Sequence, residues 1–204
     1  MTDPTPLDQP SGVDAPETVQ VDAADTRSRA ARSYRSLIEW AAVIVGALVV
    51  ALLVKVFLIQ AFYIPSESML PTLMVRDRVL VNKLDADVSS IDRGDVIVFD
   101  RPGGPGADGI SELIKRVIAL PGETVEGADG RVKIDGEFIE EDYLPEGATT
   151  STFGPETVPI GHVWVMGDNR NFSDDSRRFK FIPEEDIVGT AFVIIWPPGD
   201  ISML

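Results

Sequence analysis

The sequence predicts a mainly β domain behind a single N-terminal transmembrane helix. Short runs of β-branched and aromatic residues, separated by Gly and Pro, fill residues 60–204, and this spacing is typical of a β-barrel or sandwich. No long amphipathic helix interrupts these runs, so an α/β fold is disfavoured. Upstream of them, residues 37–59 form one apolar stretch whose only charged residues, Glu39 and Lys55, lie near its two ends.

Residues 1–36 are polar and show no apolar periodicity. The first 26 residues carry six acidic side chains, no Lys or Arg, and four Pro. A segment of this composition buries too little apolar surface to fold. We therefore expect residues 1–36 to be a disordered tail.

The apolar stretch from Leu37 to Ile59 is long enough to cross a bilayer. Its 23 residues span roughly 34 Å as a helix, against about 30 Å of hydrocarbon. A cleaved signal peptide is disfavoured because the stretch starts late and has no small-x-small exit sequence. Four Arg precede the stretch and none follows it until Arg76. The positive-inside rule therefore places the N-terminus in the cytoplasm and residues 60–204 outside.

Six strands are expected in the external domain. Each is a β-prone run bounded by turn residues such as Asp129-Gly130 or Pro121-Gly122. The expected strands are Val79–Val81, Asp95–Phe99, Glu112–Leu120, Arg131–Ile134, His162–Met166 and Ile187–Trp196.

Composition excludes several classes of function. The absence of Cys excludes a thiol nucleophile, a disulfide scaffold and a Cys-ligated metal, and the single His162 excludes a multi-His site. A net charge of −15 argues against a nucleic-acid partner, because phosphate binding needs a basic surface. Residues 60–204 carry 13 basic and 26 acidic side chains, so anionic headgroups repel this domain. No metal and no other cofactor is expected.

The segment Ile64–Leu73 holds two hydroxyl groups on a stiff turn. Ser66 and Ser68 lie between Pro65 and Pro71, and each Pro restricts its own backbone and that of the preceding residue. A rigid, exposed Ser suits nucleophilic catalysis. Turns also favour Ser and Pro for structural reasons alone, so this segment by itself is weak evidence.

A serine nucleophile needs a base, and the residues alone leave two lysines open. Lys83 follows one apolar strand and Lys115 lies within another. Burial can lower the pKa of a lysine to about 7–8, where its neutral amine accepts a proton. Periodicity does not choose between them. His162, at the start of an apolar strand, is more typical of a structural residue.

The segment Met166–Arg177 is a dense polar loop that follows an apolar strand. Its Asp, Asn and Arg residues indicate a hydrogen-bonded support network, with charge-assisted pairs such as Asp175 with Arg177. A calcium loop is disfavoured, because the EF-hand spacing is absent and the basic residues oppose cation binding.

Together these segments resemble the bacterial type I signal peptidases, the membrane-anchored Ser/Lys leader peptidases. The resemblance covers about residues 37–196. Four ordered motifs carry it: Pro65–Leu73, Arg93–Ile97, Lys115–Glu123 and Gly167–Arg177. The departures are modest, with Glu67 where Gly is frequent and Asn171-Phe172 where Asp-Asn is expected.

The resemblance implies a role for each matching residue. Ser68 would be the nucleophile, and Lys115 rather than Lys83 would be the general base. Ser66 would join the Ser68 N–H in an oxyanion hole. The implied support residues are Ser173, which would orient the lysine amine, and the pair Asp175 and Arg177. The implied fold is a β-rich core with a short insertion at about 123–160.

The expected activity is removal of N-terminal signal peptides from exported preproteins through an acyl-enzyme, at the outer face of the cytoplasmic membrane. Shallow apolar pockets would select small residues at −1 and −3. Their expected lining is Ile64, Pro65, Leu73 and Ile114, which flank the reactive groups. The expected partners are signal peptides, the lipid bilayer and the secretion machinery.

Four other classes of protein are alternatives to this interpretation. A non-catalytic, membrane-tethered binding module would suit the same β domain and acidic surface. A penicillin-binding type acyltransferase needs Ser-x-x-Lys and an α/β-hydrolase needs Gly-x-Ser-x-Gly, and the chain contains neither. A self-cleaving repressor is disfavoured by the anchor and by the lack of a DNA-binding segment.

Overall fold

The computed structural model describes residues 39–52, 54, 58–85, 88–107 and 109–204. The expected tail, residues 1–36, lies outside this range, as do residues 37–38, 53 and 55–57 of the expected span. Residues 39–52 and 54 are helical. In the part of the chain that is described, no helix is both long and apolar enough to cross a membrane. The chain divides into two units at residues 48/49, and the β domain belongs to the second.

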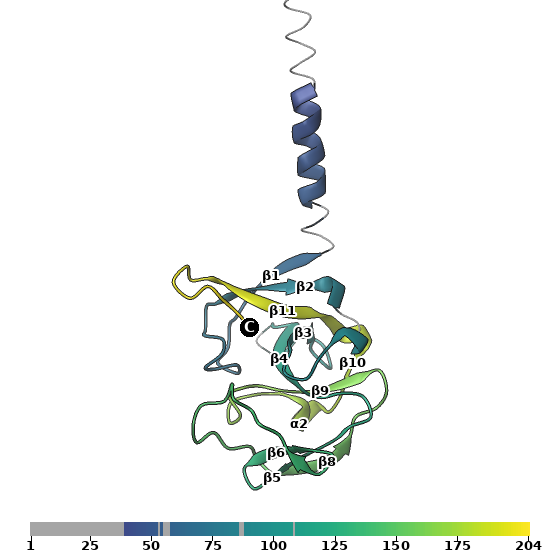
Figure 1. Ribbon diagram of the computed structural model, residues 1–204, viewed down its shortest axis with the longest axis vertical. Helices are drawn as coiled ribbons and strands as arrows, with labels where there is room; N and C mark the ends of the chain where they lie inside the picture. The colour runs from purple at the N-terminus through teal and green to yellow at the C-terminus, as the bar shows by residue number, and fades with distance from the viewer. Residues whose placement is uncertain (1–38, 53, 55–57, 86–87, 108) are drawn as a thin grey trace, which may run out of the picture. The chain divides into compact units, whose positions relative to one another are not determined.

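The prediction of a mainly β domain is confirmed. Among the described residues, eight strands form one antiparallel sheet in the order β1-β2-β11-β3-β4-β9-β10, with β12 paired to β11. In Figure 1, β11 runs beside β2 and β3. The strands are β1 (Ile59–Tyr63), β2 (Arg78–Asn82), β3 (Val96–Asp100), β4 (Glu112–Ala119), β9 (His162–Met166), β10 (Ile182–Pro183), β11 (Ile187–Trp196) and β12 (Ser202–Met203).

A second antiparallel sheet forms within residues 124–157, the part of the chain to which the family resemblance assigned an insertion. Its four strands, as described, run in the order β7-β6-β5-β8. They are β5 (Thr124–Ala128), β6 (Arg131–Ile134), β7 (Glu137–Phe138) and β8 (Phe153–Thr157). Short helical segments complete the domain: α2 (Ser176–Phe179) and three 3₁₀ turns, Lys83–Asp85, Val88–Ser90 and Glu184–Asp186.

Burial explains why the sequences of the interior strands are continuous apolar runs. Four of the five residues of β3 are buried, as are six of the eight of β4, because both faces of these strands are covered. Strand β11 instead alternates between buried and half-buried positions over Ile187–Phe192, as expected for a strand with one covered face.

The two sheets share one hydrophobic cluster. Trp164 of β9 is fully buried and stacks on Phe153 of β8, with ring centroids 5.3 Å apart. Ile118 of β4 packs in the same cluster as Val125 and Val132 of the smaller sheet. This packing fixes the small sheet against the end of β4 that lies beyond Lys115.

Candidate active site

Ser68 lies in the long loop, residues 64–77, that joins β1 to β2. The loop is closed at its neck by hydrogen bonds from Ile64 N to Asp77 O and from Arg76 N to Ile64 O, both 2.9 Å. Met69 and Leu73 are fully buried and anchor the loop in the core. Ser68 is consequently held in place with only 7% of its surface exposed.

Lys115 reaches Ser68 from the middle of β4. Its Nζ donates to Ser68 Oγ at 2.8 Å and to Ile114 O at 2.7 Å. The lysine is 2% exposed, and its strand lies between β3 and β9. The second hydroxyl, Ser66 Oγ, is 3.3 Å from Ser68 Oγ, and Ser66 is exposed.

Burial lowers the pKa of Lys115 to about 8, from its ordinary value of 10.5. Removal from water penalises the charged ammonium, and the nearby carboxylates of Asp175, Asp174 and Asp168 offset part of this penalty. A substantial fraction of Lys115 is therefore neutral just above neutral pH. A neutral amine within hydrogen-bond distance of a serine hydroxyl can accept its proton.

The predicted pair Asp175 and Arg177 forms a bidentate ion pair in which the carboxylate is fully buried. Arg177 Nε and Nη2 each donate to an Asp175 carboxylate oxygen at 2.8 Å, and Gly167 N–H donates to the same carboxylate at 3.1 Å. Burial alone would raise the pKa of Asp175, but these bonds outweigh it and the pKa lies below its usual value. Asp175 therefore remains a carboxylate and caps the start of α2.

Ser173 is buried beside Gly167. A Cβ on Gly167 would clash with Ser173 Oγ and with Ser68 O, so only glycine allows these segments to approach this closely. Within the described residues, Ser173 Oγ forms no hydrogen bond of good geometry, although it lies close enough to the Asp175 carboxylate to help lower the pKa of that group. The expected hydrogen bond between Ser173 and Lys115 is thus not formed in this structure.

A second buried ion pair joins three segments around the site. Arg116 donates through Nε and Nη2 to both carboxylate oxygens of Asp168, at 2.9 and 2.6 Å. Thr72 Oγ1, in the Ser68 loop, donates to Asp168 at 2.5 Å. Arg116 also lies 4.0 Å from the ring centroid of Tyr143. Arg116, Asp168 and Thr72 lie within the quoted motifs, but no spacing rule could have paired residues up to 96 positions apart.

The residues expected to line a substrate pocket divide into two kinds. Ile64, Leu73 and Ile114 are buried in one core cluster, whereas Pro65 is exposed. The first three can therefore contribute only the floor of a surface groove.

The remaining base candidates lie elsewhere in the fold. Lys83 begins a 3₁₀ turn at the end of β2, is half-buried, and donates its backbone N–H to Leu58 O at 2.9 Å. His162 opens β9, with Nδ1 3.0 Å from Ile160 O. Of the two lysines left open by the residues alone, Lys115 is the one bonded to Ser68.

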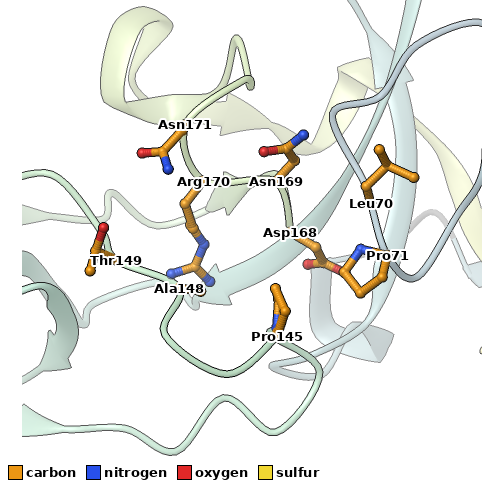
Figure 2. A pocket seen from close by; sticks show the side chains of 9 residues that line it. All are labelled: Leu70, Pro71, Pro145, Ala148, Thr149, Asp168, Asn169, Arg170 and Asn171. Carbon is orange, nitrogen blue, oxygen red and sulfur yellow. The ribbon is translucent and has the colours of Figure 1, made fainter.

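A cavity of about 260 Å³ lies between the Ser68 loop and the polar loop after β9. Figure 2 shows Asp168, Asn169, Arg170 and Asn171 following one another along that loop, with Leu70 and Pro71 facing them. Asn169 also lines this cavity, and no individual role for it is predicted from the sequence. A single asparagine in a polar loop gives no periodic signal from which a role could be predicted.

Comparison with known proteins identifies the family. The family model described as "Signal peptidase, peptidase S26" matches residues 37–196. A signal peptidase I of Leptolyngbya laminosa is 42% identical over 163 residues, which is 78% of this chain and 79% of that protein. A probable signal peptidase I of a Synechocystis strain is 44% identical and covers 74% of this chain and 78% of its own. Signal peptidase I S of Bacillus subtilis is 36% identical, over 80% of this chain and 91% of its own.

The match extends from the apolar stretch to the last long strand, and it includes both segments that the Lys115–Ser68 hydrogen bond joins. The chain therefore belongs to the peptidase S26 signal peptidases, serine endopeptidases that remove signal peptides.

Proposed function

We propose that this chain cleaves signal peptides from exported preproteins with Ser68 as nucleophile and Lys115 as general base. The observation that carries the proposal is the 2.8 Å hydrogen bond between Lys115 Nζ and Ser68 Oγ, in a site where burial lowers the pKa of the lysine to about 8. Serine is a weak nucleophile until a base removes its proton, and no other titratable side chain bonds to Ser68 in the described part of the chain.

The reaction has two steps. The neutral Lys115 amine takes the Ser68 hydroxyl proton while Ser68 Oγ bonds to the scissile carbonyl carbon. The C–N bond then breaks, the leaving amine takes the proton from the Lys115 ammonium, and an ester acyl-enzyme remains. Water attacks this ester with Lys115 again acting as base, and Ser68 is released. This sequence is the Ser/Lys variant of serine protease chemistry.

The oxyanion of each tetrahedral intermediate is bound by two donors, the Ser68 N–H and the Ser66 hydroxyl. Ser66 Oγ lies 3.3 Å from Ser68 Oγ, so a single carbonyl carbon bonded to Ser68 is within reach of both groups. Removal of one such donor typically lowers the rate by about 10²–10³.

The support residues hold the lysine rather than react. Asp175, fixed by Arg177 and Gly167, supplies negative charge near the Lys115 amine and limits how far burial lowers its pKa. Ser173 orients the amine once its hydroxyl turns toward Nζ. Its burial beside Gly167 and next to the Asp175 carboxylate favours this role.

The signal peptide lies extended against the free edge of β4. Strand β3 pairs with β4 over Glu112–Arg116, but β9 pairs with it only from Arg116 onward. The opposite edge of residues 112–115 is therefore open to an added strand. Small residues at −1 and −3 fit a shallow groove with Pro65 at its surface and a floor of Ile64, Leu73 and Ile114.

The location follows from the charge and apolar pattern of the sequence. Residues 1–36 form a cytoplasmic tail, residues 37–59 a membrane anchor, and residues 60–204 the external catalytic domain, with the secretion machinery as a further partner. Ser68 follows Ile59 by nine residues, which keeps the cleavage site at the bilayer surface.

The experiment is a cleavage assay in detergent. The substrate is a preprotein with Ala at −3 and −1, and wild type is compared with Ser68→Ala and Lys115→Ala. We expect wild type alone to cut at the Ala-x-Ala boundary, identified by mass spectrometry of the product. Cleavage by either folded variant would overturn the dyad. If none of the three folded proteins cleaves, a non-catalytic binding module becomes the better description.

A further inference from the structure

The peptide bond between Glu67 and Ser68 is held from its carbonyl side. The Glu67 oxygen accepts hydrogen bonds from the Asn169 side-chain Nδ2 at 3.0 Å and from Leu70 N–H at 3.2 Å. The next carbonyl, Ser68 O, accepts from the backbone N–H of Asn169 at 3.1 Å. One residue, 102 positions away from Glu67, thus binds two successive carbonyl groups of the Ser68 loop.

The opposite side of that peptide bond is the Ser68 N–H. Because a peptide unit is planar and its C=O and N–H point in opposite directions when it is trans, fixing the Glu67 oxygen also fixes the direction of the Ser68 N–H. Within the described residues, the Ser68 N–H has no protein acceptor. It therefore remains available to an oxygen atom developing charge at Ser68.

Asn169 is itself held by its neighbours. Asp168 is 1% exposed and is bonded to Arg116, and Arg170 is 4% exposed and is bonded to Glu141 and Thr150. Figure 2 shows Asn169 between these two side chains on the same loop, opposite Leu70. Its amide is therefore presented by a rigid backbone, as electrostatic pre-organisation requires.

We propose that Asn169 is a positioning residue of the oxyanion hole. Its amide orients the Glu67–Ser68 peptide and, by donating to the carbonyl, polarises that peptide so that the Ser68 N–H becomes a stronger donor. This inference rests on the proposed function, in which Ser68 is the nucleophile and its N–H binds the oxyanion.

The test compares Asn169→Ala and Asn169→Asp with wild type. The Asp variant keeps the shape of the side chain but replaces the donor with an acceptor that repels the Glu67 oxygen. The matched control is Asn171→Ala, which changes an exposed asparagine two residues along the same loop. Circular dichroism melts show whether each variant is folded, and kcat, KM and the pH profile are measured for each.

We expect kcat to fall about 5- to 10-fold in Asn169→Ala, the value of one exposed hydrogen bond, and further in Asn169→Asp. In Asn169→Ala, KM and the midpoint of the pH profile should not change, because neither substrate binding nor Lys115 is altered. In Asn169→Asp the added carboxylate should raise the midpoint, as Asp168 and Asp175 do, so kcat is compared on the plateau above it. A peptide aldehyde provides a second readout. Lys115 takes the Ser68 proton while Ser68 Oγ bonds to the aldehyde carbon, the C=O π pair moves to the oxygen, and the resulting oxyanion occupies the hole. Its affinity should fall in parallel with kcat, and the affinity of a non-reacting peptide should be unchanged.

Three results would overturn the inference. These are a kcat equal to that of wild type in both variants, a change confined to KM, and a loss of kcat without a matching loss of aldehyde affinity. If Asn169→Ala melts early, the isosteric Asn169→Asp decides. Parallel assays of Ser68→Ala and Lys115→Met distinguish a failure of the proposed function from a failure of the positioning role. Activity in those variants overturns the proposed function itself, whereas inactivity there with an unaffected Asn169→Ala overturns only the positioning role.

Discussion

Lys83 and Lys115 have similar local sequences and different surroundings. Both belong to or come just after an apolar strand, but Lys83 is half-buried at the end of β2, whereas Lys115 is 2% exposed in the middle of β4 and bonded to Ser68. Ser68 comes from a loop 47 residues earlier in the chain. The comparison teaches that the burial which lowers a lysine pKa is supplied by distant segments, and that the flanking residues do not determine it.

The largest expected difference between the two lysines is in activity. Lys115→Met should lower kcat/KM by about 10⁴-fold or more, because the base is removed while the apolar volume is kept. Lys83→Met should stay within about twofold of wild type, as a change at a partly exposed position away from the reacting atoms. The measurement is cleavage of the Ala-x-Ala preprotein under kcat/KM conditions. An inactive Lys83→Met beside an active Lys115→Met would reverse the assignment.

The pH profile gives the next largest effect. Since only the neutral amine accepts the Ser68 proton, kcat/KM should rise tenfold per pH unit below the lysine pKa and level off above about 8. Between pH 6 and pH 8 this amounts to roughly 50- to 100-fold. Lys83→Met should show the same profile. Activity that falls as the pH rises from 6 would contradict a neutral-amine base.

Stability should change in the opposite direction to activity. Lys115 binds its proton less tightly when folded, so the native state is penalised at every pH below about 8 and the penalty disappears as pH rises past 10.5. Lys115→Met should therefore be more stable than wild type by about 1–3 kcal/mol at pH 7, and by much less at pH 10.5. Urea unfolding at both pH values measures this. If Lys115→Met were less stable than wild type at pH 7, burial of the charged amine would not destabilise the folded state. Lys83→Met is the control.

The smallest effect concerns the carboxylates around Lys115. Asp175 raises the lysine pKa against the dominant effect of burial, so Asp175→Asn should move the midpoint of the pH profile downward. Asp174→Asn should act in the same direction and less strongly, and it leaves the Asp175–Arg177 pair intact. Asp200→Asn, in the C-terminal turn, serves as the unaffected control. An upward shift in the first two variants would contradict the electrostatic account.

Six strands could be predicted because each carries its own signal, whereas β5 and β8, with the sequences TVEGA and FGPET, lack a run of β-branched residues and were not expected. The six expected runs correspond to β2, β3, β4, β6, β9 and β11, where β-branched residues are dense and turn residues bound them. Strand β1 is not predicted from the sequence because Ile59, its first residue, ends the apolar stretch and the sequence pattern assigns it to the span. Strands of two residues, such as β7 and β10, have no periodicity and exist only because a neighbouring strand offers hydrogen-bond partners.

The contacts of the site also fall into two groups, those that the sequence predicts and those that it does not. The family motifs supplied Ser68 and Lys115, and the 2.8 Å contact between them agrees with that resemblance. The contact of Asn169 with Glu67 and that of Arg116 with Asp168 depend on how loops meet in three dimensions. Such contacts cannot be predicted from local sequence, because turn geometry places polar residues in loops and no periodic pattern marks their positions.

The order of these segments along the chain has a consequence for biosynthesis. Ser68 leaves the ribosome before Lys115, and the residues that fix both, Asp168 and Asp175, come about a hundred residues after Ser68. Until the strand preceding them has paired with β4, the serine has neither a desolvated base nor a rigid backbone around it. If Ser68 and Lys115 act as proposed, a nascent or partly folded chain is therefore chemically inert, and the site becomes able to hydrolyse a peptide only after Asp168 and Asp175 have been translated.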